Sequence, residues 1–313
     1  MQSWDLDHKI QVTKTRIIEW HQYYKGNVYV SFSGGKDSTV LLDLVRRIYP
    51  DVPAVFVDTG LEYPEIRDFV KSKENVEWLH PQKYDRKTKQ YKRYTFKEVL
   101  KDYGYPIISK EVSDAVYCAR SKPDGHRAKK FDPNSDYCLK YGKRFDLSKW
   151  KFLLDSDIPI SHMCCNVMKK EPVKKYEKET GRYAILGTMA CEAQHRKREW
   201  LKTGCNGFNK KRPTSQPISF WTEQDVLTYL RDFELPYASV YGNIIENKNK
   251  LETSGVNRTG CMFCGFGCHL EKEPNRFQQM KLTHPQLYDY CMKPTEDGGL
   301  GLKKVLDFIN VKY

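Results

Sequence analysis

A loop at residues 31–39 concentrates residue types that bind phosphate. It contains two glycines, a lysine, an aspartate and several hydroxyl side chains: Ser31, Ser33, Gly34, Gly35, Lys36, Asp37, Ser38 and Thr39. The apolar run at 28–30 predicts a buried strand before the loop, and apolar periodicity at 40–48 predicts a helix after it. A strand-to-helix turn directs backbone N–H groups and the helix dipole at an anion, and Lys36 adds a positive charge. We therefore predict an anion site at this loop.

The spacing within the loop excludes two common phosphate motifs. A Walker A loop needs four residues between its first glycine and its Gly-Lys pair, whereas Gly34 and Gly35 are adjacent. A dinucleotide fingerprint needs Gly-x-Gly-x-x-Gly, and the sequence has no such pattern. The anion site therefore belongs to another class of phosphate loop.

Two separated cysteine pairs could supply thiolate ligands to a metal centre. Cys261 and Cys264 form a CxxC in a glycine-bearing turn, and Cys164 and Cys165 are adjacent much earlier in the chain. Four sulfurs suffice for a tetrahedral zinc or a four-iron cluster, and the spacing leaves both open. A thioredoxin-type redox CxxC is a third alternative, although the glycines at 265 and 267 disfavour the helix N-terminus that it needs.

The composition describes a globular and strongly basic chain. The 313 residues carry a net charge of +13, which favours nucleic acid or a nucleotide as partner, with a solvated basic surface as the alternative. No run of eighteen apolar residues occurs and residues 1–7 do not resemble a secretory signal, so we expect no membrane segment and a cytoplasmic location. In that compartment the ten cysteines indicate metal ligands, reactive thiols or buried small residues rather than disulfides.

The elements that must position these residues follow a βαβ pattern. Apolar strands at 28–30 and 54–57 flank the predicted helix and therefore indicate a parallel sheet. Ligands of such sheets lie at the carboxyl ends of the strands, where Asp58, Thr59 and Gly60 join the loop. Further strands are expected at 76–80 and 183–187, and helices at 5–25, 62–70, 96–101, 110–120, 147–154, 169–180, 191–201, 222–233, 274–280 and 285–291.

Lysines, arginines and tyrosines interleave between residues 83 and 151, where few regular patterns occur. Such a segment could contact a phosphate backbone and stack tyrosines on unpaired bases. The alternative is a solvated insertion whose tyrosines pack locally. We predict two domains: an α/β nucleotide-binding domain at 1–235 that carries this basic insertion, and a small irregular C-terminal lobe at 236–313 with the CxxC.

Several motifs, taken in order, resemble the PP-loop ATP pyrophosphatase superfamily and, within it, the PAPS and APS (sulfonucleotide) reductases. The matching segments are 33–38, the Asp-Thr-Gly to Pro-Glu stretch at 58–65, Cys164-Cys165 with Lys169-Lys170-Glu171-Pro172, and 221–226 with Leu235-Pro236-Tyr237. The resemblance implies an α/β, Rossmann-like parallel-sheet fold. It also implies that a [4Fe-4S] cluster is held by Cys164, Cys165, Cys261 and Cys264.

The resemblance further implies an ATP site, with Mg²⁺ near Asp37 or Asp58 and with Lys36 and Asp37 as catalytic residues. The nucleotide-binding residues that it implies are Ser31, Ser33, Gly34, Gly35, Lys36, Asp37, Ser38, Asp58, Thr59, Gly60, Gly187, Glu192 and Arg196. Met189 stands where the family usually has an arginine. Candidates to replace that charge are Lys110, Arg196, Lys197 and Arg198.

The C-terminal segment separates this chain from the reductases. Their nucleophilic cysteine lies in a Glu-Cys-Gly-Leu-His tail, and here no cysteine follows Cys291. We therefore expect an enzyme that adenylates its substrate with pyrophosphate release and takes part in sulfur transfer to tRNA or DNA, with a sulfur or electron donor protein as a further partner. The alternatives are a sulfonucleotide reductase that uses another thiol, such as Cys268 or Cys291, and a non-catalytic nucleotide- or nucleic-acid-binding protein.

Overall fold

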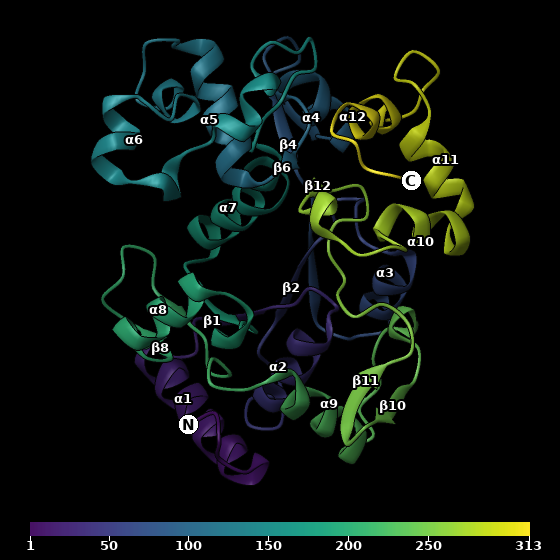
Figure 1. Cartoon of the computed structure of the whole chain (residues 1–313). Coiled ribbons are helices and arrows are strands. Elements are labelled where there is room, and N and C mark those ends of the chain that lie inside the picture. The colour runs from purple at the N-terminus through teal and green to yellow at the C-terminus, as the bar shows by residue number, and fades with distance from the viewer. The chain divides into compact units, whose positions relative to one another are not determined.

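The computed structural model describes residues 1–313 and divides them into two compact units (Figure 1). Unit 1 comprises Met1–Asp58, Glu62–His80 and Pro172–Thr259. Unit 2 comprises Thr59–Leu61, Pro81–Glu171 and Gly260–Tyr313. Each unit is therefore assembled from segments that are far apart in the sequence.

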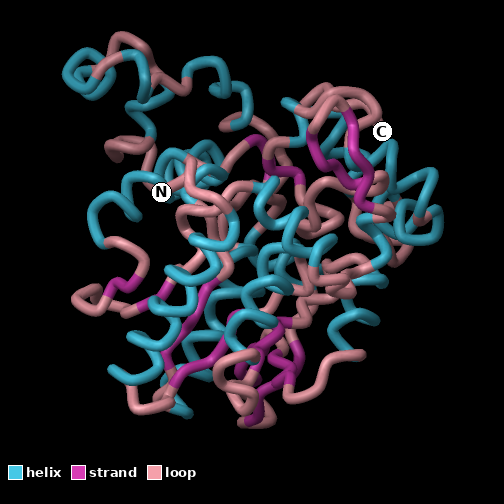
Figure 2. Tube along the Cα trace, turned by 90° about the horizontal axis from the view of Figure 1, so that it is seen from below, coloured by secondary structure: helices cyan, strands magenta, loops and turns pink.

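A six-stranded sheet with the order β3-β2-β1-β7-β9-β8 forms the centre of unit 1. Its strands are β1 (Val28–Ser31), β2 (Ala54–Val57), β3 (Val76–Leu79), β7 (Tyr183–Leu186), β8 (Asn206–Gly207) and β9 (Thr214–Ser215). Neighbouring strands are parallel except β8 and β9. In the view of Figure 2 the longer strands lie together with helices beside them. This arrangement confirms the predicted α/β fold.

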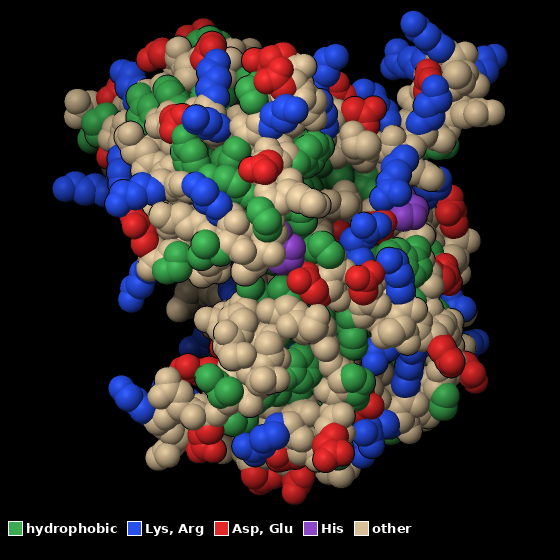
Figure 3. Space-filling model, turned by 90° about the vertical axis from the view of Figure 1, so that its right-hand side faces the viewer, with side chains coloured by type: hydrophobic (Ala, Val, Ile, Leu, Met, Phe, Trp, Pro, Cys, Tyr) green, Lys and Arg blue, Asp and Glu red, His purple; other side chains and the backbone are tan.

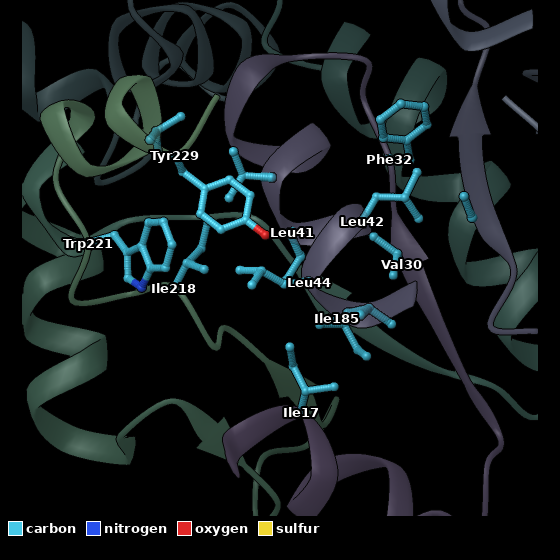
Figure 4. Close-up of a cluster of buried hydrophobic side chains, with 14 of the residues drawn as sticks. Ile17, Val30, Phe32, Leu41, Leu42, Leu44, Ile185, Ile218, Trp221 and Tyr229 are labelled. Carbon is cyan, nitrogen blue, oxygen red and sulfur yellow. The ribbon is translucent and has the colours of Figure 1, made fainter. Parts of the chain in front are cut away.

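Alternating side chains of the central strands supply two separate cores, one on each face of the sheet. Val30 and Phe56 belong to the larger core, to which helices α1 (Leu6–Tyr23), α2 (Lys36–Arg46) and α9 (Glu223–Asp232) contribute. Tyr29 and Val55, which point the other way, pack with Tyr176 of α7 (Glu171–Thr180). Figure 4 shows how side chains of the larger core converge from these helices and from the sheet. Because both faces of the sheet are buried, these strands appear in the sequence as continuous apolar runs.

The remaining elements of unit 1 surround the sheet. Its other helices are α1 (Leu6–Tyr23), α2 (Lys36–Arg46), α3 (Pro64–Lys71), α8 (Gln194–Thr203) and α9 (Glu223–Asp232). Two 3-10 turns are η5 (Ala190–Glu192) and η6 (Ser239–Tyr241). A hairpin is formed by β10 (Ile244–Asn247) and β11 (Lys250–Thr253). Thr222 caps α9: its hydroxyl accepts from the backbone N–H of Asp225, whose carboxylate accepts from the N–H of Thr222. This capping box stabilises the helix start that the sequence predicts.

Unit 2 is built from short helices and two strand pairs. The helices are α4 (Phe96–Tyr103), α5 (Lys110–Ser121), α6 (Asp136–Tyr141), α10 (Arg276–Thr283), α11 (Pro285–Met292) and α12 (Leu302–Phe308), with 3-10 turns Ala128–Phe131, Lys143–Phe145, Ser148–Leu153 and Cys268–Leu270. The strands are β4 (Gln82–Asp85) with β5 (Gln90–Arg93), and β6 (Ile107–Ile108) with β12 (Gly265–Phe266). None of the protein's helices combines the length and apolar character needed to span a bilayer.

The two units differ from the consecutive domains predicted at 1–235 and 236–313. The insertion groups with the C-terminal segment because contacts such as the parallel pairing of β6 with β12 connect them. Residues 236–259 instead complete unit 1.

Two helices also differ from prediction: residues 148–153 form a 3-10 helix, and α8 starts at Gln194 because Ala190–Glu192 form a separate turn.

Some basic residues of the insertion stabilise its own fold. Arg120 donates hydrogen bonds to the backbone carbonyls of Leu153 and Ile158. Lys130 is buried, and its Nζ lies 2.8 Å from Glu111 Oε1. These two cations are therefore engaged within unit 2, so the basic composition of the insertion overstates the charge that a nucleic acid could contact.

Candidate functional site

The loop at residues 31–39, here called the phosphate loop, connects the carboxyl end of β1 to the first turn of α2. Gly35 is the N-cap of α2 and offers no side-chain hydrogen bond, so first-turn N–H groups are left for other acceptors. Hydroxyl groups brace the turn: Ser38 Oγ lies 3.2 Å from Ser33 N and donates to Gly35 O at 2.9 Å. A helix N-terminus of this kind favours a bound anion.

Close packing explains two glycines at this site. Gly34 has φ of +70°, and a Cβ there would lie 2.8 Å from a methyl group of Ile66. Gly187 follows β7, and a Cβ there would lie 3.1 Å from Asp37 O and from Ser38 N. The structure thus places the predicted site residue Gly187 against the start of α2, where only a residue without a side chain allows β7 to approach.

Lys36 is buried and ion-paired. Only 5% of the residue is exposed, and its Nζ lies 2.9 Å from Oε1 of Glu223, the first residue of α9. The same ammonium lies 5.2 Å from the centre of the Tyr241 ring. The Tyr241 hydroxyl accepts from Lys36 N at 3.4 Å and is hydrogen-bonded to Thr259 Oγ1 at 2.7 Å. An anion that binds Lys36 must therefore compete with Glu223.

Asp37 has an unusual electrostatic environment for a carboxyl group. Burial raises the pKa of Asp37 to about 6, and the charge of Glu192 also raises it. Lys36 opposes this shift, Glu223 adds to it and Arg258 opposes it. The phosphate loop therefore contains a carboxyl group whose protonation changes near neutral pH, a property that is frequent in functional sites.

Glu192 links the turn after β7 to two arginines. Its carboxylate forms ion pairs with Arg196 and Arg258 and accepts a hydrogen bond from Met189 N at 3.0 Å. Two predicted nucleotide ligands, Glu192 and Arg196, are thus paired with each other. The charged side chains around the phosphate loop balance in number: Lys36, Arg196 and Arg258 against Asp37, Glu192 and Glu223.

Asp58 lies at the carboxyl end of β2, the strand beside β1. Its carboxylate is buried, 3.1 Å from Arg67 Nη2 and 3.5 Å from His80 Nδ1. The structure therefore places Asp58 at the predicted edge of the sheet. Thr59 and Gly60 follow it directly in the chain, but they group with unit 2.

The four cysteines predicted to bind metal all belong to unit 2, and we call them the cysteine cluster. Cys164 and Cys165 precede a π-helical turn at Asn166–Lys170, and their Sγ atoms are 4.0 Å apart. The hydrogen bond with Cys165 and burial raise the pKa of Cys164, and the charges of Cys264 and Cys261 raise it further. None of the four forms a disulfide. The fold therefore brings together the two pairs that the sequence separates by almost a hundred residues.

Positive charges lie beside the cysteine cluster. The hydrogen bond with Cys164, followed by the charges of Lys110 and Lys169, lowers the pKa of Cys165 to about 5 in spite of burial. Thiolates are the form that ligates metal, and this shift favours the thiolate at Cys165, whereas burial raises the pKa of Cys264. No three His, Cys, Asp or Glu side chains are arranged as a ready-made metal site. Metal binding by these residues therefore stays a prediction.

The other cysteines weighed as reactive thiols are mostly inaccessible. Cys268 and Cys291 are 1% and 0% exposed. Burial raises the pKa of Cys268 to about 11 and also raises that of Cys291, so both favour the neutral thiol. Cys191 is exposed beside Glu192 in unit 1, where burial and that carboxylate raise its pKa.

Four polar neighbours of the phosphate loop were not predicted from the sequence: Glu223, Tyr241, Arg258 and Thr259. The capping signal at Thr222 indicates that Glu223 starts a helix, but it does not show that this helix begins beside Lys36. The other three lie in a turn-rich stretch without a periodic pattern. Only the folded chain brings them to the loop.

A parallel α/β sheet with a phosphate loop after a central strand defines this protein as a member of the nucleotide-binding α/β class. Residues 27–110 and 138–266 match the family described as the phosphoadenosine phosphosulfate reductase domain. The chain belongs to this family. The match includes the phosphate loop and all four residues of the cysteine cluster, and it confirms the resemblance that the motifs indicate.

Named relatives of the chain differ in what they are described to do. An uncharacterized protein of Methanocaldococcus jannaschii is 26% identical over 292 residues, and the chain spans about half of it (91% of this chain, 52% of that protein). An adenosine 5'-phosphosulfate reductase of Staphylococcus epidermidis is 23% identical over 254 residues (79% and 74%). The U34-tRNA thiolase NcsA from Methanococcus maripaludis, solved with its [4Fe-4S] cluster, superposes with a TM-score of 0.36 and 14% identity (98% and 82%).

Proposed function

We propose that the protein binds ATP at the phosphate loop, activates an acceptor by adenylation with release of pyrophosphate, and takes part in sulfur transfer to a nucleic acid. One observation carries the proposal. A single chain of this family combines a phosphate loop holding a buried lysine with two cysteine pairs in one unit that lie near enough for the charges of Cys261 and Cys264 to act on Cys164. A sulfur or electron donor protein is the further partner that we propose.

The charges around the phosphate loop favour a nucleotide that arrives with a cation. Three cations and three carboxylates already balance there, so a bare polyphosphate would meet the charges of Asp37, Glu192 and Glu223 as well as Lys36. Carboxylate oxygens are the ligands that Mg²⁺ prefers, usually together with substrate phosphates. Asp37 and Asp58 are the residues that we propose lie near Mg²⁺, whose role would be to neutralise phosphate charge.

The proposed adenylation is a displacement at the α-phosphorus of ATP. An oxygen of the acceptor forms a bond to that phosphorus, and the bond to the bridging oxygen of the β-phosphate breaks, so pyrophosphate leaves with the electron pair. Lys36 and the first-turn N–H groups of α2 hold the departing phosphates and stabilise the charge that develops on them. A sulfur nucleophile from the donor then displaces AMP from the acceptor.

The cysteine cluster is proposed to hold a [4Fe-4S] centre. With all four cysteines as ligands, such a centre would have a structural or electrostatic role; if one iron were left without a cysteine ligand, it would offer a position for exogenous sulfide. Lys110 and Lys169 lie close enough to lower the pKa of Cys165, and such cations offset the negative charge that thiolate ligands bring into a partly buried site.

Pyrophosphate release tests the nucleotide part of the proposal. Wild-type protein, incubated with ATP, Mg²⁺ and unfractionated tRNA, is expected to release pyrophosphate and AMP. Lys36→Ala is expected to lower the rate at least 100-fold, because it removes a charge that stabilises the leaving group. The matched control is Lys178→Ala, an exposed lysine of α7, which should leave the rate unchanged. Equal rates in the two variants would exclude the proposed role of Lys36.

Anaerobic purification tests the cysteine cluster. The wild-type protein is expected to be brown and to contain about four irons and four sulfides per chain. Cys261→Ser or Cys264→Ser should lose most of the iron, whereas Cys118→Ser, which changes a half-buried thiol of α5 in the same unit, should keep it. A colourless protein loaded with zinc would contradict the iron–sulfur assignment and support the alternative metal.

A sulfonucleotide reductase is the second candidate, because the family is described by that activity and one named relative is an adenosine 5'-phosphosulfate reductase. This activity requires a reactive thiol. Cys268 and Cys291 are buried and favour the neutral thiol, so neither is well suited to attack sulfur as it stands. Reduction of adenosine 5'-phosphosulfate by thioredoxin, abolished by Cys291→Ser in a folded variant, would favour this candidate over the first.

A further inference from the structure

The outer face of α8 presents cations that no other part of the protein uses. The inner face of the helix is fixed by Trp200, which packs against the larger core, and by Arg196, which pairs with Glu192. On the opposite face, the exposed residues Lys197, Arg198 and Lys202 have no carboxylate within ion-pair distance. Leu201 lies among them and is 69% exposed.

The loop after α8 continues this surface. Lys210 joins it to the helix through an ion pair with Glu199 at 2.9 Å, and Lys211 is exposed beside it. Phe208 of the same loop packs against Tyr23 at the end of α1, with 4.5 Å between ring centres. Tyr23 is 62% exposed. Cations and an accessible aromatic ring therefore lie along one contiguous part of unit 1, which Figure 1 shows as α8 and β8 beside α1.

We propose that this surface, the basic ridge of α8, residues 208–211 and Tyr23, binds an RNA through its phosphate backbone and an unpaired base. The inference rests on the proposed function, because it assigns the acceptor of the sulfur transfer to RNA and locates its docking surface. Residues 194–212 contain seven lysines and arginines and a single acidic residue. Arg196, Lys210 and Arg212 are ion-paired, so Lys197, Arg198, Lys202 and Lys211 are the cations that we propose contact a polyanion.

The position of the ridge favours it over the basic insertion as the docking surface. Arg196 lies in the first turn of α8 and pairs with Glu192, whose charge acts on Asp37 of the phosphate loop. An RNA held on the outer face of this helix is therefore bound to the same unit that would activate it. Figure 3 draws another face of the molecule, on which basic and acidic side chains are interspersed over most of the surface and basic side chains gather on a projection at the upper right.

The accessible aromatic ring favours RNA with unpaired bases over duplex DNA. A base must leave its stack before its atoms can react, and RNA loops offer such bases without the energy cost of opening a duplex. Tyr23 is braced by Phe208 and also lies 4.9 Å from the ring of Tyr24. A ring held in place on one side and open on the other is suited to stack on a base.

Equilibrium binding of unfractionated tRNA, measured by fluorescence anisotropy across 50–300 mM salt without ATP, tests the ridge. The triple variant Lys197→Gln, Arg198→Gln, Lys202→Gln should weaken binding on the order of 50-fold near 0.15 M salt and reduce the salt slope by about 2. Glutamine keeps the helix propensity of α8. Tyr23→Ala should weaken binding about 10-fold with an unchanged slope, and Tyr23→Phe should restore it.

The matched control tests the alternative that the basic insertion, and not the ridge, is the docking surface. Lys140→Gln, Lys143→Gln, Arg144→Gln removes three exposed cations of unit 2 and should change affinity less than 3-fold. A large loss in this variant with none in the α8 variant would overturn the proposal, as would equal affinity for duplex DNA of the same length. If the triple variant fails to fold, Arg198→Gln alone should weaken binding about 4-fold.

The outcomes of these experiments distinguish a failure of the proposed docking surface from a failure of the proposed activity. Lys36→Ala should keep full tRNA affinity, because the ridge does not include the phosphate loop. A wild type that binds tRNA through the ridge but releases no pyrophosphate would defeat the proposed function alone. A wild type that releases pyrophosphate, with tRNA affinity indifferent to the ridge variants, would defeat this inference alone.

Discussion

Asp37 and Lys36 are neighbours in the chain, and both are held in surroundings that their charges do not favour. Lys36 is buried and relies on Glu223, while Asp37 is half-buried near two carboxylates. Burying a charge is costly unless a partner compensates it. A bound nucleotide with its cation would give both residues new partners, so binding energy can be used to rearrange charges that are strained in the free protein.

Replacing Asp37 by Asn should stabilise the free protein at neutral pH. The folded-state pKa of about 6 lies above the ordinary value of 3.8, so the folded state holds this proton more tightly than the unfolded state. Ionisation of Asp37 therefore reduces stability as pH rises from about 4 through 6. Without nucleotide or Mg²⁺, Asp37→Asn should raise the free energy of unfolding by about 3 kcal/mol at pH 7.

Urea unfolding at two pH values checks this expectation. Below about pH 3 both folded and unfolded wild-type chains carry the proton, and the difference between variant and wild type should disappear. Asp51→Asn, which changes an exposed aspartate in the turn before β2, serves as the control and should shift stability at neither pH. A pH-independent difference for Asp37→Asn would mean that packing or hydrogen bonding, and not ionisation, accounts for it.

At the scale of elements, the site depends on how closely β7 approaches the start of α2. Gly187 touches the backbone of Asp37 and Ser38 at the point where the phosphate loop becomes helix. The parallel pairing of β1 with β7 fixes that approach, because Ser31 is in register with Leu186, the residue before Gly187. The position of the proposed anion site is therefore set by neighbouring strands as much as by the loop itself.

Gly187→Ala should damage the site more than the fold. The added methyl group would lie 3.1 Å from three backbone atoms, so the start of α2 must shift by a few tenths of an ångström. We expect a stability loss of about 1–2 kcal/mol and a larger relative loss of ATP affinity, measured by thermal unfolding and by calorimetric titration. Gly260→Ala, where the methyl group meets nothing within 4 Å, should be neutral in both measurements. Unchanged ATP affinity in Gly187→Ala would contradict the proposed anion site.

The elements with strong local patterns were predictable from the sequence. The strand predicted at 54–57 is β2 with the same bounds, and the cap predicted at Thr222 starts α9. The short strands β6, β8, β9 and β12 were not predicted, because two residues carry no periodicity and their pairing partners lie far away in the chain. Tertiary contact alone defines them.

The candidate site was predictable only in part. Local motifs identify the phosphate loop and both cysteine pairs, because each depends on residue types at short spacing. The ion pair of Lys36 with Glu223 spans 187 positions, and no local pattern encodes it. The sequence also does not show which cations form bonds within the protein. Arg120 and Lys130 form a hydrogen bond and an ion pair inside unit 2, whereas Lys197 and Arg198 on α8 are exposed.

At the scale of the whole molecule, the cysteine cluster depends on two distant segments of unit 2. Cys164 and Cys165 lie at the end of the insertion, and Cys261 and Cys264 lie just before β12. The parallel pair β6–β12 and the hydrogen bond from Met262 N to Leu61 O hold the second segment in unit 2. Unit 2 therefore requires the C-terminal segment for its structure as well as for two of its thiols.

Truncation after residue 259 should disorganise unit 2 while sparing unit 1. All segments of unit 1 end at or before Thr259, whereas β6 would lose its partner β12. We expect trypsin to cleave the truncated chain within 81–171 at least ten times faster than the full chain, with near-native protection of 1–58 and 172–259. Mass spectrometry of the peptides gives the sites. Rapid cleavage throughout both units would show that unit 1 cannot fold without the C-terminal segment.

The strand order has a consequence for how this protein could be divided. The insertion separates the chain into a first part that supplies β3, β2 and β1 and a second part that supplies β7, β9 and β8. The sheet order preserves this division, and the two halves meet at a single seam between β1 and β7. A chain split inside the insertion would therefore yield two pieces with complementary sheet edges, suited to a reporter whose proposed nucleotide site is rebuilt only when the pieces associate.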